Sequence, residues 1–222
     1  MRKILGFVIL NDNKNLKDVS ISWVFTLIFL PLTLFLLIQN YGLEFVTNDY
    51  IGLVLEFVFV GMVPLLIVII RKEEWKNYGF NLTNWKKSTG YGLALLTPIL
   101  LFKIYAYLYL GYVGWSWNLT PSLFLIYVPV YGPLEAFFII FSVHKLDKGL
   151  SSSRLLSKGL ILTSILFGLM HTANYLLHPN LRIILTGYII GNIIPALIVG
   201  AIFKKTKSIL GSCLFWTVLN FF

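Results

Sequence analysis

Three polar residues stand in otherwise apolar stretches of the chain and carry groups that could do chemistry: Glu135, His171 and Asn220. A carboxylate can act as a general base toward water, an imidazole can bind a metal ion or stabilise charge, and an amide can donate to a developing oxyanion. His171 follows Lys158 by about 13 residues, and Asn220 follows Lys207 by about 13 residues. Glu135 lies about ten residues from the inner end of its own apolar stretch. In helices these offsets place all three at one depth, about 15–20 Å from one membrane face. Depth alone leaves two interpretations open: a catalytic site, or a structural cluster of interhelical hydrogen bonds.

The composition shows what kind of elements must hold these residues. Of the 222 residues, 58% are hydrophobic and 12% are charged, and the mean hydropathy is +0.82. Soluble domains carry about 25% charged residues. So much apolar surface requires lipid as a solvent, and the lipid bilayer is therefore the first expected partner. The single cysteine, Cys213, excludes a disulfide framework within the chain and any multi-cysteine metal site.

Stretches of about 20 apolar residues predict membrane-spanning helices. The sequence therefore predicts an all-α, multi-pass transmembrane helix bundle of about seven spans, with residues 1–19 as a cytoplasmic N-terminal segment and 20–222 as a single transmembrane domain. The last stretch is short, so a partly inserted helix is one interpretation of it, whereas seven crossings would leave the C-terminus outside. The expected spans are residues 20–38, 50–70, 89–110, 122–141, 160–177, 183–203 and 208–222.

The basic residues give an orientation. Sixteen of the 18 fall before the first span or in alternate loops, which is the positive-inside pattern and places the N-terminus in the cytoplasm. The net charge of +9 is then an orientation signal and does not indicate a nucleic-acid partner. These residues are Arg2, Lys3, Lys14 and Lys17; Arg71, Lys72, Lys76, Lys86 and Lys87; Lys145, Lys148, Arg154 and Lys158; and Lys204, Lys205 and Lys207.

Other polar groups have simpler expected roles. Glu56 and Lys103 lie at similar depths, about 10–12 Å below the outer surface, where they could form an ion pair or snorkel. His144 and His178 are expected at the two membrane interfaces. An aromatic cluster after residue 104 is expected to form an interfacial belt. Prolines inside spans predict kinks, at Pro31, Pro64, Pro98 and Pro195.

Three local sequences resemble the motifs of a known family of intramembrane proteases. The stretch Gly132–Ile139 resembles the motif Glu-Glu-x-x-x-Arg, with Glu135 as the second glutamate, Leu134 in place of the first and Ile139 in place of the arginine. Phe167 to His171 is similar to Phe-x-x-x-His. Trp216 to Asn220 is similar to His-x-x-x-Asn, with tryptophan in place of the histidine. In order and spacing, residues 90–222 resemble the CPBP (CAAX protease and bacteriocin-processing, or Abi) family.

This resemblance implies an intramembrane metalloprotease. Such a protein would be a multi-pass protein of the cell membrane, and we expect a bacterial plasma membrane. By resemblance, Glu135 would activate water, His171 would be the one histidine ligand of a zinc ion, and Asn220 would stabilise the oxyanion. The substrate would be a peptide or a lipidated protein. Trp216 and Ile139 depart from the motifs and argue for reduced or lost activity. The alternative is a non-catalytic protein on the same scaffold, which confers self-immunity to a bacteriocin-type peptide or binds a peptide or partner.

Overall fold

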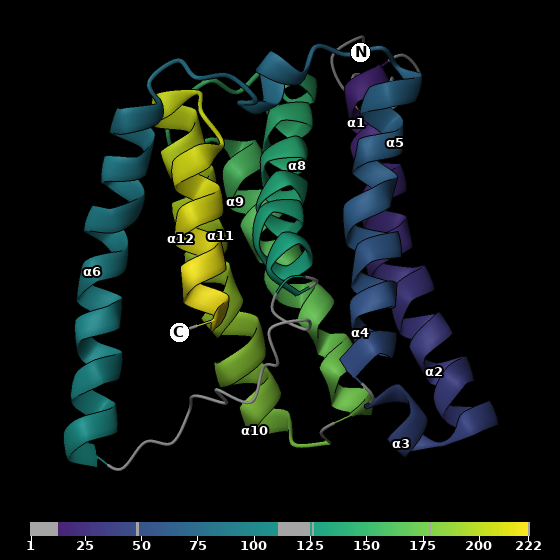
Figure 1. Cartoon of the computed structure of the whole chain (residues 1–222). Helices are drawn as coiled ribbons and strands as arrows, with labels where there is room; N and C mark the ends of the chain where they lie inside the picture. Colours follow the sequence, from purple (N-terminus) through teal and green to yellow (C-terminus); the bar gives the residue numbers. More distant parts are fainter. Residues whose placement is uncertain (1–12, 48, 111–124, 126, 178, 222) are drawn as a thin grey trace, which may run out of the picture.

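The computed structural model describes residues 13–47, 49–110, 125, 127–177 and 179–221, and its regular elements are all helical. Within these described residues, six helices are long and apolar enough to cross a membrane: Lys14–Tyr41, Tyr50–Ile70, Trp85–Tyr109, Tyr127–Gly149, Lys158–Leu176 and Leu181–Thr206. They stand side by side in one bundle (Figure 1). The prediction of an all-α, multi-pass membrane bundle is therefore confirmed.

Most spans are built from more than one helical segment. The α-helices are α1 (Lys14–Val24), α2 (Leu30–Tyr41), α3 (Leu43–Val46), α4 (Asp49–Glu56), α5 (Val63–Ile70), α6 (Trp85–Leu110), α8 (Glu135–Gly149), α9 (Lys158–Met170), α10 (Leu181–Ile183), α11 (Gly191–Thr206) and α12 (Leu210–Phe221). Wider π-helical turns occupy η2 (Phe25–Phe29), η3 (Phe57–Met62), η5 (Val130–Leu134) and η7 (Ile184–Ile190). Tighter 3₁₀ turns form η4 (Trp75–Tyr78) and η6 (His171–Leu176).

The last apolar stretch forms a short helix. Twelve residues of α12 extend about 18 Å, whereas the hydrocarbon core of a bilayer is about 30 Å thick. Figure 1 shows α12 ending part-way along the bundle, beside α6 and α11. Each of the seven predicted stretches is thus helical over most of its described residues, and six of these helices are long enough to cross. Helix α12 fits the interpretation as a partly inserted helix.

The π-helical turns accompany prolines. Pro31 and Pro64 begin the helices that follow η2 and η3, Pro133 lies within η5, and Pro195 follows η7 by five residues. Proline has no N–H to donate, so a carbonyl one turn earlier loses its partner, and a widened turn accommodates this change. Two of these turns adjoin acidic residues, since Glu56 directly precedes η3 and Glu135 directly follows η5. The turn η3 packs against both η2 and η5.

The end of the bundle where the α5–α6, α8–α9 and α11–α12 connections lie is called the basic end below (Figure 1). The fourth span was expected to stop at residue 141, with Lys145 in a surface loop, and that prediction is wrong. Helix α8 continues to Gly149, and the Lys145 side chain is 0% exposed. Its ammonium group is 2.9 Å from an oxygen of Asp18, whose side chain is 1% exposed.

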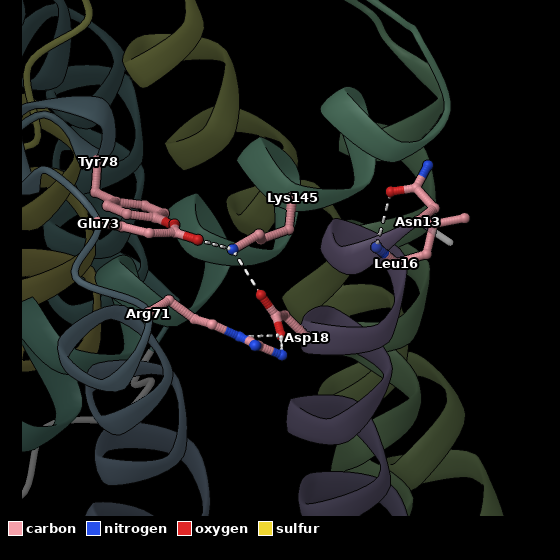
Figure 2. Close-up of polar contacts among 7 residues, drawn as sticks. All are labelled: Asn13, Leu16, Asp18, Arg71, Glu73, Tyr78 and Lys145. Atoms are coloured by element: carbon pink, nitrogen blue, oxygen red, sulfur yellow. Dashed lines mark hydrogen bonds and ion pairs between the residues drawn. The ribbon is translucent and has the colours of Figure 1, made fainter. Parts of the chain in front are cut away.

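The Lys145–Asp18 pair extends into a network that joins three spans (Figure 2). The other oxygen of Asp18 accepts hydrogen bonds from Nη2 and Nε of Arg71, at 2.9 and 3.1 Å. Lys145 also pairs with Glu73, which accepts a hydrogen bond from the Tyr78 hydroxyl. Charged groups away from water require such partners, because each one left alone carries the full cost of its lost hydration. The network therefore ties α1 and the segment after α5 to α8.

We expect Lys145→Met to lower the free energy of unfolding in detergent by about 3 kcal/mol, because a buried ion pair loses one partner. A denaturation titration followed by far-UV circular dichroism measures this change. Lys17→Met is the matched control, since Lys17 is an exposed neighbour of Asp18, and its effect should stay within about 0.5 kcal/mol. Equal effects of the two substitutions would show that the network does not stabilise the bundle.

Acid should weaken the same network through Glu73. Burial raises the pKa of this carboxyl, but the hydrogen bonds from Lys145 and Tyr78 outweigh burial and hold its pKa below the ordinary value of 4.5. Its stabilising contribution is therefore complete above the unfolded-state pKa and is lost as the pH falls through the lower folded-state pKa. We expect the difference in unfolding midpoint between the wild type and Glu73→Gln to be constant at neutral pH and to shrink below about pH 4.5. A difference that stays constant down to pH 3 would contradict this.

Candidate functional site

The structure places Glu135 inside the bundle, at the first turn of α8. Its side chain is buried, with 5% of the residue exposed. Asn220 lies in the last turn of α12, and His171 begins η6. Asn220 is exposed near the end of α12, and its hydrogen bond to Glu135 places its amide at the depth of that carboxyl.

One oxygen of the Glu135 carboxyl, Oε2, is held by two neutral donors from α12. The indole N–H of Trp216 donates to it at 2.6 Å, and the amide of Asn220 donates at 3.0 Å. The same amide nitrogen also donates to the backbone carbonyl of Tyr131. Two residues four apart on α12 lie on one face of the helix, which lets both reach the same oxygen.

A glycine allows α12 to approach this closely. The position that a side chain at Gly132 would occupy is already taken by Thr217 of α12. Glycine at this point of η5 thus removes the steric obstacle between the turn and α12. The contact places the carbonyl of Tyr131 and the carboxyl of Glu135 in reach of the same amide.

A second carboxyl, from Glu56, reaches Glu135, and this corrects the prediction that Glu56 and Lys103 could pair. The two carboxyl groups are in hydrogen-bonding contact, and Oε1 of Glu56 is buried without a hydrogen-bond partner. Lys103 instead donates to the backbone carbonyl of Leu219, at 3.3 Å. Two carboxylates in contact repel each other strongly in a low-dielectric interior, and sharing one proton relieves that repulsion.

The sequence could have predicted the pairing of Glu56 with Glu135 if the depth of Glu56 had been counted from the basic end and not from the outer surface. Counted from the basic end, Glu56 lies about 15 residues before Arg71, close to the offsets of about 13 residues that place His171 and Asn220. The same count for Glu56 predicts its place at the level of the site. The role of Trp216 as a donor had no such signal, because an indole in an apolar stretch is ordinary.

His171 joins the site only through an aromatic ring. Its Nδ1 is 2.8 Å from the backbone carbonyl of Phe167, and among the described contacts none links it to Glu135 or Asn220. The Phe167 ring contacts the imidazole, with centroids 5.3 Å apart, and packs edge-on against the indole of Trp216 at 5.2 Å. The structure thus brings Glu135 and Asn220 into direct contact, whereas the Phe167 ring lies between His171 and Trp216.

The donor set does not suit the zinc ion that the motifs imply. Catalytic zinc sites take three protein ligands, commonly from histidine, cysteine and carboxylates. Across residues 13–221, masked positions aside, no group of three or more such side chains is close enough to hold a metal ion. The indole of Trp216 also donates to one oxygen of the Glu135 carboxyl, Oε2. His171 is the one imidazole beside the carboxyls in the part of the chain that the structure describes, and this set of residues does not fit a zinc site.

The remaining predicted positions fall in three groups. His144 lies half-buried at the basic end against Tyr78, with ring centroids 4.9 Å apart. His178 and residues 111–124 of the predicted aromatic belt lie outside the described residues. On α6, the residues Tyr105, Tyr107 and Tyr109 are 51%, 54% and 73% exposed, as expected of residues that face lipid or its interface.

A membrane-spanning helical bundle with a hydrogen-bonded carboxyl group at its centre agrees with the class of protein that the motifs indicated. Residues 117–222 match the family model described as type II CAAX prenyl endopeptidase, Rce1-like. The matched part of the chain is similar to that family and contains Glu135, His171 and Asn220. No curated protein and no solved structure matches the chain.

The hydrogen bond between Trp216 and Glu135 should show energetic coupling. We expect a double-mutant cycle of Trp216→Phe and Glu135→Gln to give a coupling energy of about 2 kcal/mol, because a donor to a charge-bearing group is removed. The matched control is Trp23→Phe, since the indole N–H of Trp23 is buried without a partner. Its coupling with Glu135→Gln should be within about 0.5 kcal/mol of zero. Similar coupling in both cycles would argue against the Trp216 contact.

Proposed function

We propose that this protein is an intramembrane protease of the CPBP type, in which Glu135 activates water to hydrolyse a peptide bond. The observation that carries the proposal is the carboxyl of Glu135, buried in the bundle and held through one oxygen by Trp216 and Asn220. A general base needs a fixed carboxylate with an oxygen left to accept a proton. Because both donors bind Oε2, the other oxygen of Glu135 receives no hydrogen bond from α12, and we assign it the role of accepting the proton of water.

Glu56 supplies the general acid that a single carboxylate base lacks. A pair of carboxyls that share one proton can act as base and acid in the same turnover. Water attacks the carbonyl carbon and gives a proton to Glu135, and the tetrahedral intermediate forms. The C–N bond then breaks as Glu56 gives its proton to the leaving nitrogen. The products are a carboxylic acid and an amine, and the carboxyl pair again holds one proton.

Asn220 acts as a positioning residue in this arrangement. Its amide nitrogen has two hydrogens, and both have acceptors, one on Glu135 and one on Tyr131. The resemblance suggested an oxyanion donor, and that role would require the amide to release one of these acceptors when substrate binds. Trp216 positions the same oxygen through its shorter hydrogen bond.

Trp216 also favours a second candidate function, a non-catalytic protein that binds a peptide. The indole stands where the third motif has histidine, and it fills the space beside the carboxyl, since Trp216 as a whole is 1% exposed. Self-immunity to a bacteriocin-type peptide is the form of this function that the resemblance suggests. In either case we expect a multi-pass protein of a bacterial plasma membrane whose partner is a peptide or a lipidated protein.

Purified protein reconstituted into liposomes with a bacterial membrane proteome tests the proposal, with new peptide termini counted by mass spectrometry. We expect Glu135→Gln to reduce cleavage by about 100-fold or more, because the base is lost. Glu56→Gln should also reduce cleavage and should change its pH profile. Glu44→Gln is the matched control, since Glu44 is exposed on α3, and it should leave cleavage unchanged.

Two outcomes would contradict the enzymatic proposal. Cleavage that survives Glu135→Gln would remove the assigned base. The absence of any cleavage by the wild type, together with peptide binding that Glu135→Gln weakens, would favour the non-catalytic function.

A further inference from the structure

A cavity of about 330 Å³ opens at the basic end, away from the Glu135 site. Helices α8 and α11 form two of its walls, and the loop after α8 forms a third. Its polar lining is mostly basic or hydroxylic. These polar residues are His144, Asp147, Lys148, Ser151, Ser152, Ser153, Lys204 and Lys207.

The acidic group in this lining is already neutralised within the protein. Asp147 forms an ion pair with Lys204 through one oxygen and accepts the backbone N–H of Gly159 at 3.1 Å through the other. Lys148 and Lys207 have no ion-pair partner among the described residues, although the Lys207 ammonium lies over the Phe203 ring at 5.6 Å. The cavity is therefore left with two uncompensated positive charges.

Neutral donors complete the lining. Nε2 of His144 is buried and has no hydrogen-bond partner. The hydroxyl oxygen of Ser152 accepts the backbone N–H of Lys158, which leaves the hydroxyl hydrogen free to donate. Ser151 and Ser153 add two exposed hydroxyls beside it. Such a set of donors and cations matches an oxyanion with several acceptor oxygens.

The helix ends near the cavity do not oppose an anion. Both α8 and α11 end beside it, and carbonyls at helix C-termini repel anions when they are left without partners. Here the carbonyls of Asp147, Lys148 and Phe203 accept backbone N–H groups from Ser152, Ser151 and Lys207. Burial and the charge of Lys204 also lower the pKa of Lys207. A bound anion would stabilise the charged form of this lysine.

We propose that this cavity binds a phosphate group, supplied by the headgroup of an anionic phospholipid. The cavity lies at the basic end of the bundle, where the membrane-spanning segments meet the headgroup layer. Basic pockets between transmembrane helices, on the side of the membrane where basic residues gather, bind anionic headgroups. The inference is independent of the proposed proteolysis, because none of the residues that line the cavity belongs to the carboxyl site.

Thermal unfolding in nanodiscs tests the proposal. Nanodiscs of phosphatidylcholine alone are compared with nanodiscs doped with phosphatidic acid, and with phosphatidylcholine nanodiscs to which inorganic phosphate is added. We expect phosphatidic acid to raise the unfolding midpoint and inorganic phosphate to do so only at much higher concentration. In Lys148→Gln/Lys207→Gln, the apparent affinity for phosphatidic acid should fall about tenfold further than in the control.

The matched control is Lys158→Gln/Lys205→Gln, which removes two exposed lysines from the same end of the bundle without touching the cavity. His144→Phe is a second test variant, because it keeps the ring packing against Tyr78, removes the unpartnered nitrogen and should weaken binding without changing a lysine. Stabilisation by inorganic phosphate alone, lost in both cavity variants, would support the same site with a free anion as its ligand. Equal losses in the control and cavity variants, or no stabilisation by either probe, would overturn the proposal.

Discussion

Every ionisable group inside this bundle must find its partner within the protein, because lipid offers none. The cost of leaving a charge alone in a bilayer is about 2.5–3.5 kcal/mol even on the lowest scales. The described structure meets this constraint in two different ways. At the basic end, Asp18, Lys145 and Arg71 are fully charged partners held between helices. In the middle of the bundle, the carboxyl of Glu135 has neutral donors and a second carboxyl.

Two residues in the middle of the bundle, Ile139 and Trp216, depart from the family motifs, and the two departures fit together. The family motif places an arginine where this chain has Ile139, which is 0% exposed in the apolar core. Without that cation, Glu135 needs other donors, and the indole of Trp216 supplies one from the position where the motif has histidine. The two departures from the motifs are thus linked, because the second supplies part of what the first removes.

The sequence predicted the helical bundle well because the relevant signals are local. Six long apolar stretches and their basic flanks can be read from single segments, and the short seventh stretch ends inside the bundle as its length requires. It could not predict that α8 runs on past Phe141, since the charge of Lys145 suggests a loop until Asp18 is seen beside it. Glu135 and Asn220 were correctly grouped by depth. Depth does not give azimuth around a helix, and so Glu56 was assigned to the wrong neighbour and His171 was placed too near the carboxyl.

The π-helical turns explain how two carboxyls from distant segments come to meet. Glu56 and Glu135 each sit at the border between a regular helix and a turn widened beside a proline. A widened turn shifts the azimuth of every residue beyond it, which a count of 3.6 residues per turn does not foresee. Because η3 and η5 pack against each other, the shifts act on both sides of the same contact. The geometry of the site therefore depends on the prolines near it as much as on the acidic residues themselves.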